Sequence, residues 1–201
     1  MHSRYPTPRS AALLLALVLS TASAAEPRYD VLDLRTLGFR DASALNNLGH
    51  VAGRNESDEI LLWDGNTIAR IKPPGEAPYI QDLNDSGVMI GFSSHSTGPS
   101  QRSFTIADGE LAEMEDPFDS AHAINNQGQI ALTNRSRALI FKAGSLTDIG
   151  TLGGSDPWPV AINAAGWVVG SSTTNAGAGA SPRLFLSRWH HHRSGQVGQR
   201  P

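Results

Sequence analysis

Residues 161–170 read AINAAGWVVG, and this pattern decides the fold because it occurs four times. The earlier copies are ALNNLGHVAG (44–53), DLNDSGVMIG (82–91) and AINNQGQIAL (123–132). In each copy an Asn is followed three residues later by a Gly, which gives the aligned pairs Asn46 and Gly49, Asn84 and Gly87, Asn125 and Gly128, and Asn163 and Gly166. Self-similarity at a spacing of about 40 residues is typical of solenoids and propellers.

The spacing of Asn and Gly, which is the same in all four copies, predicts a tight turn. An Asn at the first position of a type I turn can accept a hydrogen bond from the backbone two residues on. A Gly three residues later supplies the positive φ that closes a turn of this kind between two strands. The flanking residues alternate and include β-branched side chains, which favour strands. We therefore interpret these eight residues as structural turn residues and assign none of them to catalysis.

A second hairpin is predicted after each of the first three copies of the motif, in residues 59–71, 102–114 and 137–149. Each of these stretches contains an apolar strand, a turn with Gly and another strand. Four short strands in about 40 residues have the size of one propeller blade. The expected fold is all-β, a propeller-like array of four four-stranded blades.

The ends of the repeat region suggest how the array closes. Residues 29–38 (YDVLDLRTLG) resemble residues 145–154 (SLTDIGTLGG), whereas the fourth repeat stops after three strands near residue 189. We expect the N-terminal segment to be a strand that completes the last blade, which would hide an exposed sheet edge. The alternatives are an open array that closes by dimerisation and a degenerate or truncated repeat fragment.

The N-terminus is expected to be a secretory signal peptide, residues 1–25. It has Arg4 and Arg9, an apolar run over residues 11–19 and the small residues Ala22-Ser23-Ala24, in the order that such signals require. The apolar run is too short to span a membrane, so we expect no membrane span after removal of the signal. The expected organisation is then a repeat domain at 26–189, a polar His-containing tail at 190–201, and Sec-type export to the periplasm or the cell exterior.

Composition narrows the classes of function. The chain has 201 residues, a formal net charge of −3 and no Cys, which excludes disulfides and thiolate chemistry. Its acidic balance argues against nucleic acid as a partner. No sequence motif for a cofactor is present, and none is expected.

Residues 147–172 (TDIGTLGGSDPWPVAINAAGWVVGSS) resemble the HAF-repeat family of exported bacterial proteins. The family pattern consists of D-L-G-T-L-G-G, then A-x-x-I-N-x-x-G-x-V-V-G, then H-A-F-L-W. The resemblance implies export and a propeller-like β architecture, and it brings no established catalytic residues. The His of the third block is replaced in every copy, by Glu59, Arg102, Arg137 and Arg183.

Two groups of residues could carry chemistry. Asp82 and Asn84, in DLNDSG, resemble the first half of an oxygen-rich calcium loop, although a turn is the simpler interpretation. If Asp82, Asp116 and Asp119 converge in a deep pocket, the chain could instead be an exported propeller enzyme acting on polysaccharide.

Trp158 is the candidate ligand contact because it lies between two prolines in a segment expected to be a loop. An exposed aromatic residue there would be a recognition anchor, and loop packing is the alternative. The hypothesis from the sequence is thus a non-catalytic binding module for an unidentified protein or glycan surface.

Overall fold

The computed structural model describes residues 29–96, 101–114, 120–134, 136–174 and 183–188. The chain divides into two compact units, Met1–Leu32 and Asp33–Pro201. Residues 29–32, the described part of the first unit, have no regular secondary structure. All described strands belong to the second unit, and the expected signal peptide (1–25) and polar tail (190–201) lie outside the described residues.

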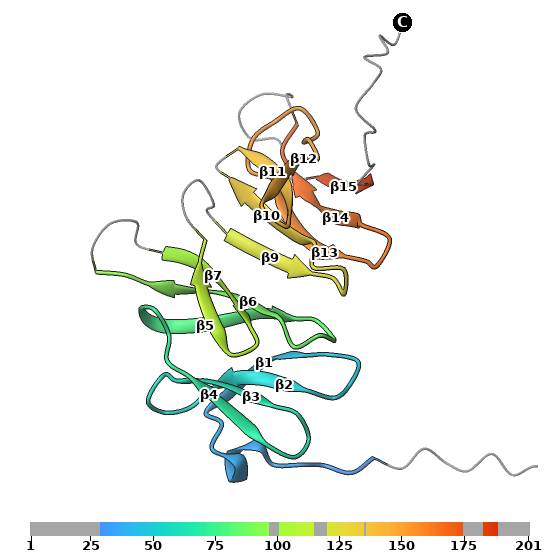
Figure 1. The fold of residues 1–201 in the computed structure, drawn as a ribbon. Coiled ribbons are helices and arrows are strands. Elements are labelled where there is room, and N and C mark those ends of the chain that lie inside the picture. The colour runs from blue at the N-terminus through green and yellow to red at the C-terminus, as the bar shows by residue number, and fades with distance from the viewer. Residues whose placement is uncertain (1–28, 97–100, 115–119, 135, 175–182, 189–201) are drawn as a thin grey trace, which may run out of the picture. The chain divides into compact units, whose positions relative to one another are not determined.

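The described residues are all-β apart from one 3-10 helix, η1 (Leu34–Leu37). Their strands form four consecutive antiparallel sheets in chain order (Figure 1). The first sheet contains β1 (Asp41–Leu45), β2 (Val51–Arg54), β3 (Ile60–Trp63) and β4 (Ile68–Ile71). The second contains β5 (Glu76–Leu83), β6 (Met89–Ser94), β7 (Gln101–Ala107) and β8 (Glu110–Glu113). The third contains β9 (Ser120–Ile124), β10 (Ile130–Asn134), β11 (Arg137–Lys142) and β12 (Ser145–Asp148). The fourth contains β13 (Trp158–Ile162), β14 (Trp167–Ser172) and β15 (Arg183–Arg188).

Each repeat therefore forms its own sheet, as the spacing of the motif predicted. Neighbouring strands within a sheet are also neighbours in the sequence, because short turns allow antiparallel pairing without a crossover. The first strand of every sheet has an irregular register shortly before the motif Asn, for example between Ile80 and Asp82. The described strands close no ring or barrel, so the propeller arrangement stays a prediction.

The core lies between consecutive sheets. We call the forward face of a sheet the side that carries Ala44 and Ala52 or their aligned counterparts, which are Asp82 and Ile90, Ala123 and Ala131, and Ala161 and Val169. The backward face carries Leu45 and Val51 or their counterparts, which are Leu83 and Met89, Ile124 and Ile130, and Ile162 and Val168. Each of three apolar clusters joins the forward face of one sheet to the backward face of the next.

The predicted N-terminal strand at residues 29–38 is wrong. Residues 29–33 have no strand, and residues 34–37 form η1. The backbone N–H of Arg35 donates to Asp33 Oδ1 at 3.0 Å, and Gly38 has φ 90°. The matching residues Asp148 and Gly153 behave alike: Asp148 Oδ1 accepts from the N–H two residues on, and Gly153 has φ 96°. The two segments therefore resemble each other in an Asp turn and a left-handed Gly, which form a loop.

As a result the fourth sheet has three described strands where the prediction had four. No helix in the described part of the chain is long and apolar enough to cross a membrane.

Candidate functional site

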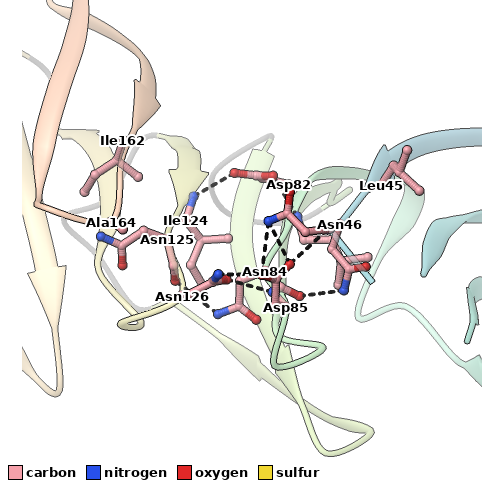
Figure 2. A pocket seen from close by; sticks show the side chains of 12 residues that line it. Leu45, Asn46, Asp82, Asn84, Asp85, Ile124, Asn125, Asn126, Ile162 and Ala164 are labelled. Atoms are coloured by element: carbon pink, nitrogen blue, oxygen red, sulfur yellow. Dashed lines mark hydrogen bonds between the residues drawn. The ribbon is translucent and has the colours of Figure 1, made fainter. Parts of the chain in front are cut away.

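The four motif asparagines form a ladder of hydrogen bonds from one sheet to the next. Asn46 Nδ2 donates to the backbone oxygen of Asn84 at 3.0 Å. Asn84 Nδ2 donates to the Asn125 oxygen at 3.1 Å, and Asn125 Nδ2 to the Asn163 oxygen at 2.9 Å. Figure 2 shows three members of this row, Asn46, Asn84 and Asn125. The side chains that begin the turns thus also join the repeats, a role that the sequence reasoning did not foresee.

The same asparagines hold their own turns. Asn84 Oδ1 accepts from the backbone N–H groups of Ser86 and Val88 at 3.0 and 2.9 Å. Asn46, Asn125 and Asn163 accept the two equivalent bonds. The four aligned glycines have φ between 69° and 81°, a region that only Gly enters at little cost. The side-chain oxygens of these asparagines therefore serve the scaffold.

A second polar row lies beside the ladder and was missed by the sequence reasoning. The carboxylate of Asp85 accepts from the Asn47 backbone N–H at 2.9 Å and from the Asn47 amide at 3.0 and 3.1 Å. It also accepts from the Asn126 amide at 2.6 Å. The side-chain hydrogen bond from Asn47 is the main cause that lowers the pKa of Asp85. The signal in the sequence is the residue after each motif Asn, which is Asn, Asp and Asn in three copies but Ala164 in the fourth.

These two rows line a cavity of about 300 Å³. Its walls are Leu45, Asn46, Asn47, Asp82, Leu83, Asn84, Asp85, Ile124, Asn125, Asn126, Ile162 and Ala164. The carboxylates in this set already accept hydrogen bonds from the protein. The amide and carboxylate groups that line the cavity are consequently already hydrogen-bonded to other groups of the protein.

Asp82 and Asn84, the calcium candidates, lie in this cavity. Asp82 Oδ2 accepts from the Ile124 N–H at 2.8 Å, and Asp82 Oδ1 accepts from the Leu83 N–H at 2.8 Å. Asn84 Oδ1 is already bonded within its turn. The described ranges contain no group of three or more His, Cys, Asp or Glu side chains that could hold a metal ion. The geometry thus assigns Asp82 to joining the second sheet to the third.

Asp116 and Asp119 lie outside the described residues, so their convergence with Asp82 stays a prediction. The backbone N–H group that donates to Asp82 Oδ2 belongs to Ile124, in the next repeat. Both carboxylate oxygens of Asp82 thus accept from backbone groups of the protein.

Trp158 begins strand β13, so its expected position in a loop is wrong. Its side chain is 57% exposed, and its ring meets the ring of His122 in a T-shaped contact with 4.4 Å between centroids. Val160, two residues on, is 61% exposed. The ring of His122 packs against the indole and leaves much of Trp158 accessible to a ligand.

His122 is buried, and its role follows from its surroundings. Its Nε2 lies 3.2 Å from Thr133 Oγ1, in hydrogen-bonding range. Burial lowers the pKa of His122 to about 4, because desolvation penalises the charged imidazolium. His122 is therefore neutral near pH 7 and supports the ring of Trp158.

A scan against protein-family models finds no matching family, and a search among curated proteins finds no significant match.

Proposed function

We propose that this chain is an exported, non-catalytic repeat protein that binds a protein or glycan surface through Trp158. The observation that carries the proposal is the exposed Trp158, whose indole is in ring contact with His122. A large aromatic side chain with restricted motion loses little entropy on binding, and Trp is enriched among the residues that dominate binding energy.

The polar motif residues are already hydrogen-bonded within the protein, which supports a binding role over a catalytic one. The motif asparagines and Asp82 are hydrogen-bonded to backbone groups of their own or adjacent repeats. Catalysis by acid and base requires groups that are free to exchange protons with a substrate. The exposed apolar pair of Trp158 and Val160 is, in contrast, suited to contact a partner.

Assignment to the HAF-repeat type, with a propeller-like arrangement and export, completes the proposal. Four consecutive antiparallel sheets at a spacing of about 40 residues are compatible with propeller blades. Export is supported by the order of charged, apolar and small residues in the N-terminal segment. Expression of the full chain in a bacterial host tests export: mass spectrometry of the periplasmic fraction should show a chain beginning at Ala25 or Glu26.

The test of binding combines a glycan array with a pull-down from the exported proteins of the source cell. We expect Trp158→Ala to weaken binding about thirtyfold or more, the loss typical of a dominant contact residue. Undiminished binding by Trp158→Ala, or no bound glycan or protein for the wild type, would contradict the proposal.

The matched control is Tyr79→Ala. Tyr79 occupies the aligned position in the second repeat, is 40% exposed and stacks on Phe92 with 5.4 Å between ring centroids. We expect this variant to bind as the wild type does. An equal loss in both variants would show that the binding surface is not centred on Trp158.

A further inference from the structure

At each end of the array, an apolar position that is buried inside the array is exposed, although Leu61 on the backward face of the first sheet is fully buried. On the forward faces, Ala52, Ile90 and Ala131 are fully buried against the next sheet, whereas the aligned Val169 of the fourth sheet is 44% exposed. On the backward faces, Leu83 and Ile124 are 4% and 6% exposed, whereas the aligned Leu45 of the first sheet is 67% exposed. Inside the array these positions are buried by the neighbouring sheet. On the forward face of the fourth sheet and the backward face of the first, no described residue covers Val169 or Leu45 to the same extent.

The asparagine ladder is open at the same two ends. Asn163 Oδ1 accepts the two bonds of its turn, but among the described residues its Nδ2 has no acceptor equivalent to Asn84, Asn125 or Asn163 in the earlier steps. At the other end, the backbone oxygen of Asn46 accepts from Gly49 N–H, and no described asparagine side chain donates to it. Among the described residues, the array therefore ends in an amide donor without a partner in a next repeat on one side, and on the other in a backbone oxygen that can accept a second bond.

The three internal interfaces show what each uncovered face fits. Inside the array a forward face always packs on the backward face of another repeat, and an Asn Nδ2 always crosses that interface to a backbone oxygen. The exposed forward face around Val169 is consequently complementary to the exposed backward face around Leu45. Two surfaces of one molecule that fit each other make a head-to-tail contact between copies.

We propose that the fourth sheet of one copy of this chain packs on the first sheet of a second copy. In this contact Asn163 Nδ2 donates to the Asn46 oxygen of the other copy, and Ala161 and Val169 lie against the side chains around Leu45. Two such contacts close a pair of chains with eight sheets, the upper end of the usual blade number in propellers.

The strand that the fourth sheet lacks supports this direction of packing. Inside the array, the outer strand β12 of the third sheet is followed in the chain by the fourth sheet. Residues 30–33, which match β12 in sequence, are likewise followed by the first sheet, yet they form no strand. In the proposed pair, residues 30–33 of a second copy come in the chain directly before the sheet that packs on the fourth sheet, whose outer strand is absent from the described residues.

The mass of the full chain in solution tests the proposal, by light scattering coupled to size-exclusion chromatography. We expect twice the mass of one chain. Val169→Asp and Leu45→Asp, each made singly, should weaken association about a hundredfold or more, because each places a charge in an apolar contact. Both positions are exposed in one copy, so the variants should keep the thermal unfolding midpoint of the dissociated chain.

Leu146→Asp is the matched control, because Leu146 in β12 is 44% exposed, as Val169 is. It should leave the mass of the particle unchanged. A wild type that is monomeric over the accessible concentration range would overturn the proposal. So would a dimer that all three variants leave intact or that all three dissociate.

A cysteine pair distinguishes contact between copies from closure within one chain. Ala161 and Leu45 align with Ala123 and Ile162, which belong to one apolar cluster at the third internal interface. The chain has no Cys of its own, so Ala161→Cys combined with Leu45→Cys reports this contact alone. Disulfide-linked dimers on a non-reducing gel support the proposal. A cross-link confined to the monomer would overturn it in favour of intramolecular closure.

Discussion

Among the described residues, the second and third sheets each have a neighbouring sheet on both faces, whereas the first and fourth each have one. Aligned side chains of similar chemistry therefore have different surroundings: Ile90 in the second sheet is fully buried, and Val169 in the fourth is 44% exposed. The local hairpin is nevertheless the same in all four repeats, with the same Asn bonds and a left-handed Gly. Turn formation is thus a property of each repeat, and burial is a property of having a neighbour.

The largest expected difference comes from truncating the aligned apolar residues. Ile90→Ala should lower the free energy of unfolding by about 2–5 kcal/mol, because it removes buried groups and leaves a cavity. Val169→Ala should lower it by less than about 1 kcal/mol in the dissociated chain, because the side chain is half exposed. Urea denaturation of both variants measures the comparison. Equal losses would mean that the fourth sheet is covered as fully as the second.

The ladder gives the next comparison, between Asn84→Ala and Asn163→Ala. Both substitutions remove the two turn bonds, but within the described part of the chain only Asn84→Ala also removes a bond to the next repeat. We expect a loss of about 2–3 kcal/mol for Asn84→Ala and about 1 kcal/mol less for Asn163→Ala, at roughly 1 kcal/mol per net hydrogen bond. The same urea measurements serve here. A greater loss for Asn163→Ala would contradict an open ladder in the dissociated chain.

The last comparison concerns pH and the junction of the third and fourth sheets, where His122 meets Trp158. The pKa of His122 is lowered from 6.5 to about 4 by burial, so the unfolded chain takes up the proton first as pH falls. Its contribution to stability is fully present above pH 6.5 and is lost between pH 6.5 and 4. From pH 7 to 5 the loss is about 2 kcal/mol, at about 1.4 kcal/mol per pH unit.

Thermal unfolding at pH 7 and pH 5 measures this effect, with His122→Gln as the control. Gln cannot titrate, and its amide can still bond to Thr133 Oγ1. The variant should therefore lose clearly less stability over this range than the wild type. The same loss in both proteins would assign the pH dependence to other groups.

Much of the fold could be predicted from the sequence because its strongest signals are local. Asn163 and Gly166 specify a turn within four residues, and the spacing of the copies specifies one sheet for each repeat. The strand predicted in the N-terminal segment was wrong because it, too, rested on a local match. Asp33 and Gly38 match Asp148 and Gly153, but these residues encode a loop. A strand also needs a second strand to pair with, and that pairing cannot be read from the sequence.

The candidate site was predicted less well because its bonds join distant repeats. Asn84 Nδ2 reaches the backbone oxygen of Asn125, an acceptor that every residue carries and that no pattern of side chains reveals. The role of Asp85 depends on Asn47 and Asn126, which lie in two other repeats. Trp158 was recognised by its residue type and flanking prolines, yet its contact with His122 required the structure.

The asparagine ladder has a consequence for how such a chain changes in length. Each of the three steps joins the amide donor of one repeat to a backbone acceptor of the repeat that follows it. Duplication or deletion of a whole repeat therefore leaves every remaining step with both of its partners. A gene that encodes this ladder can gain or lose units by recombination between its copies, and the side chains at each new junction meet groups that they already fit.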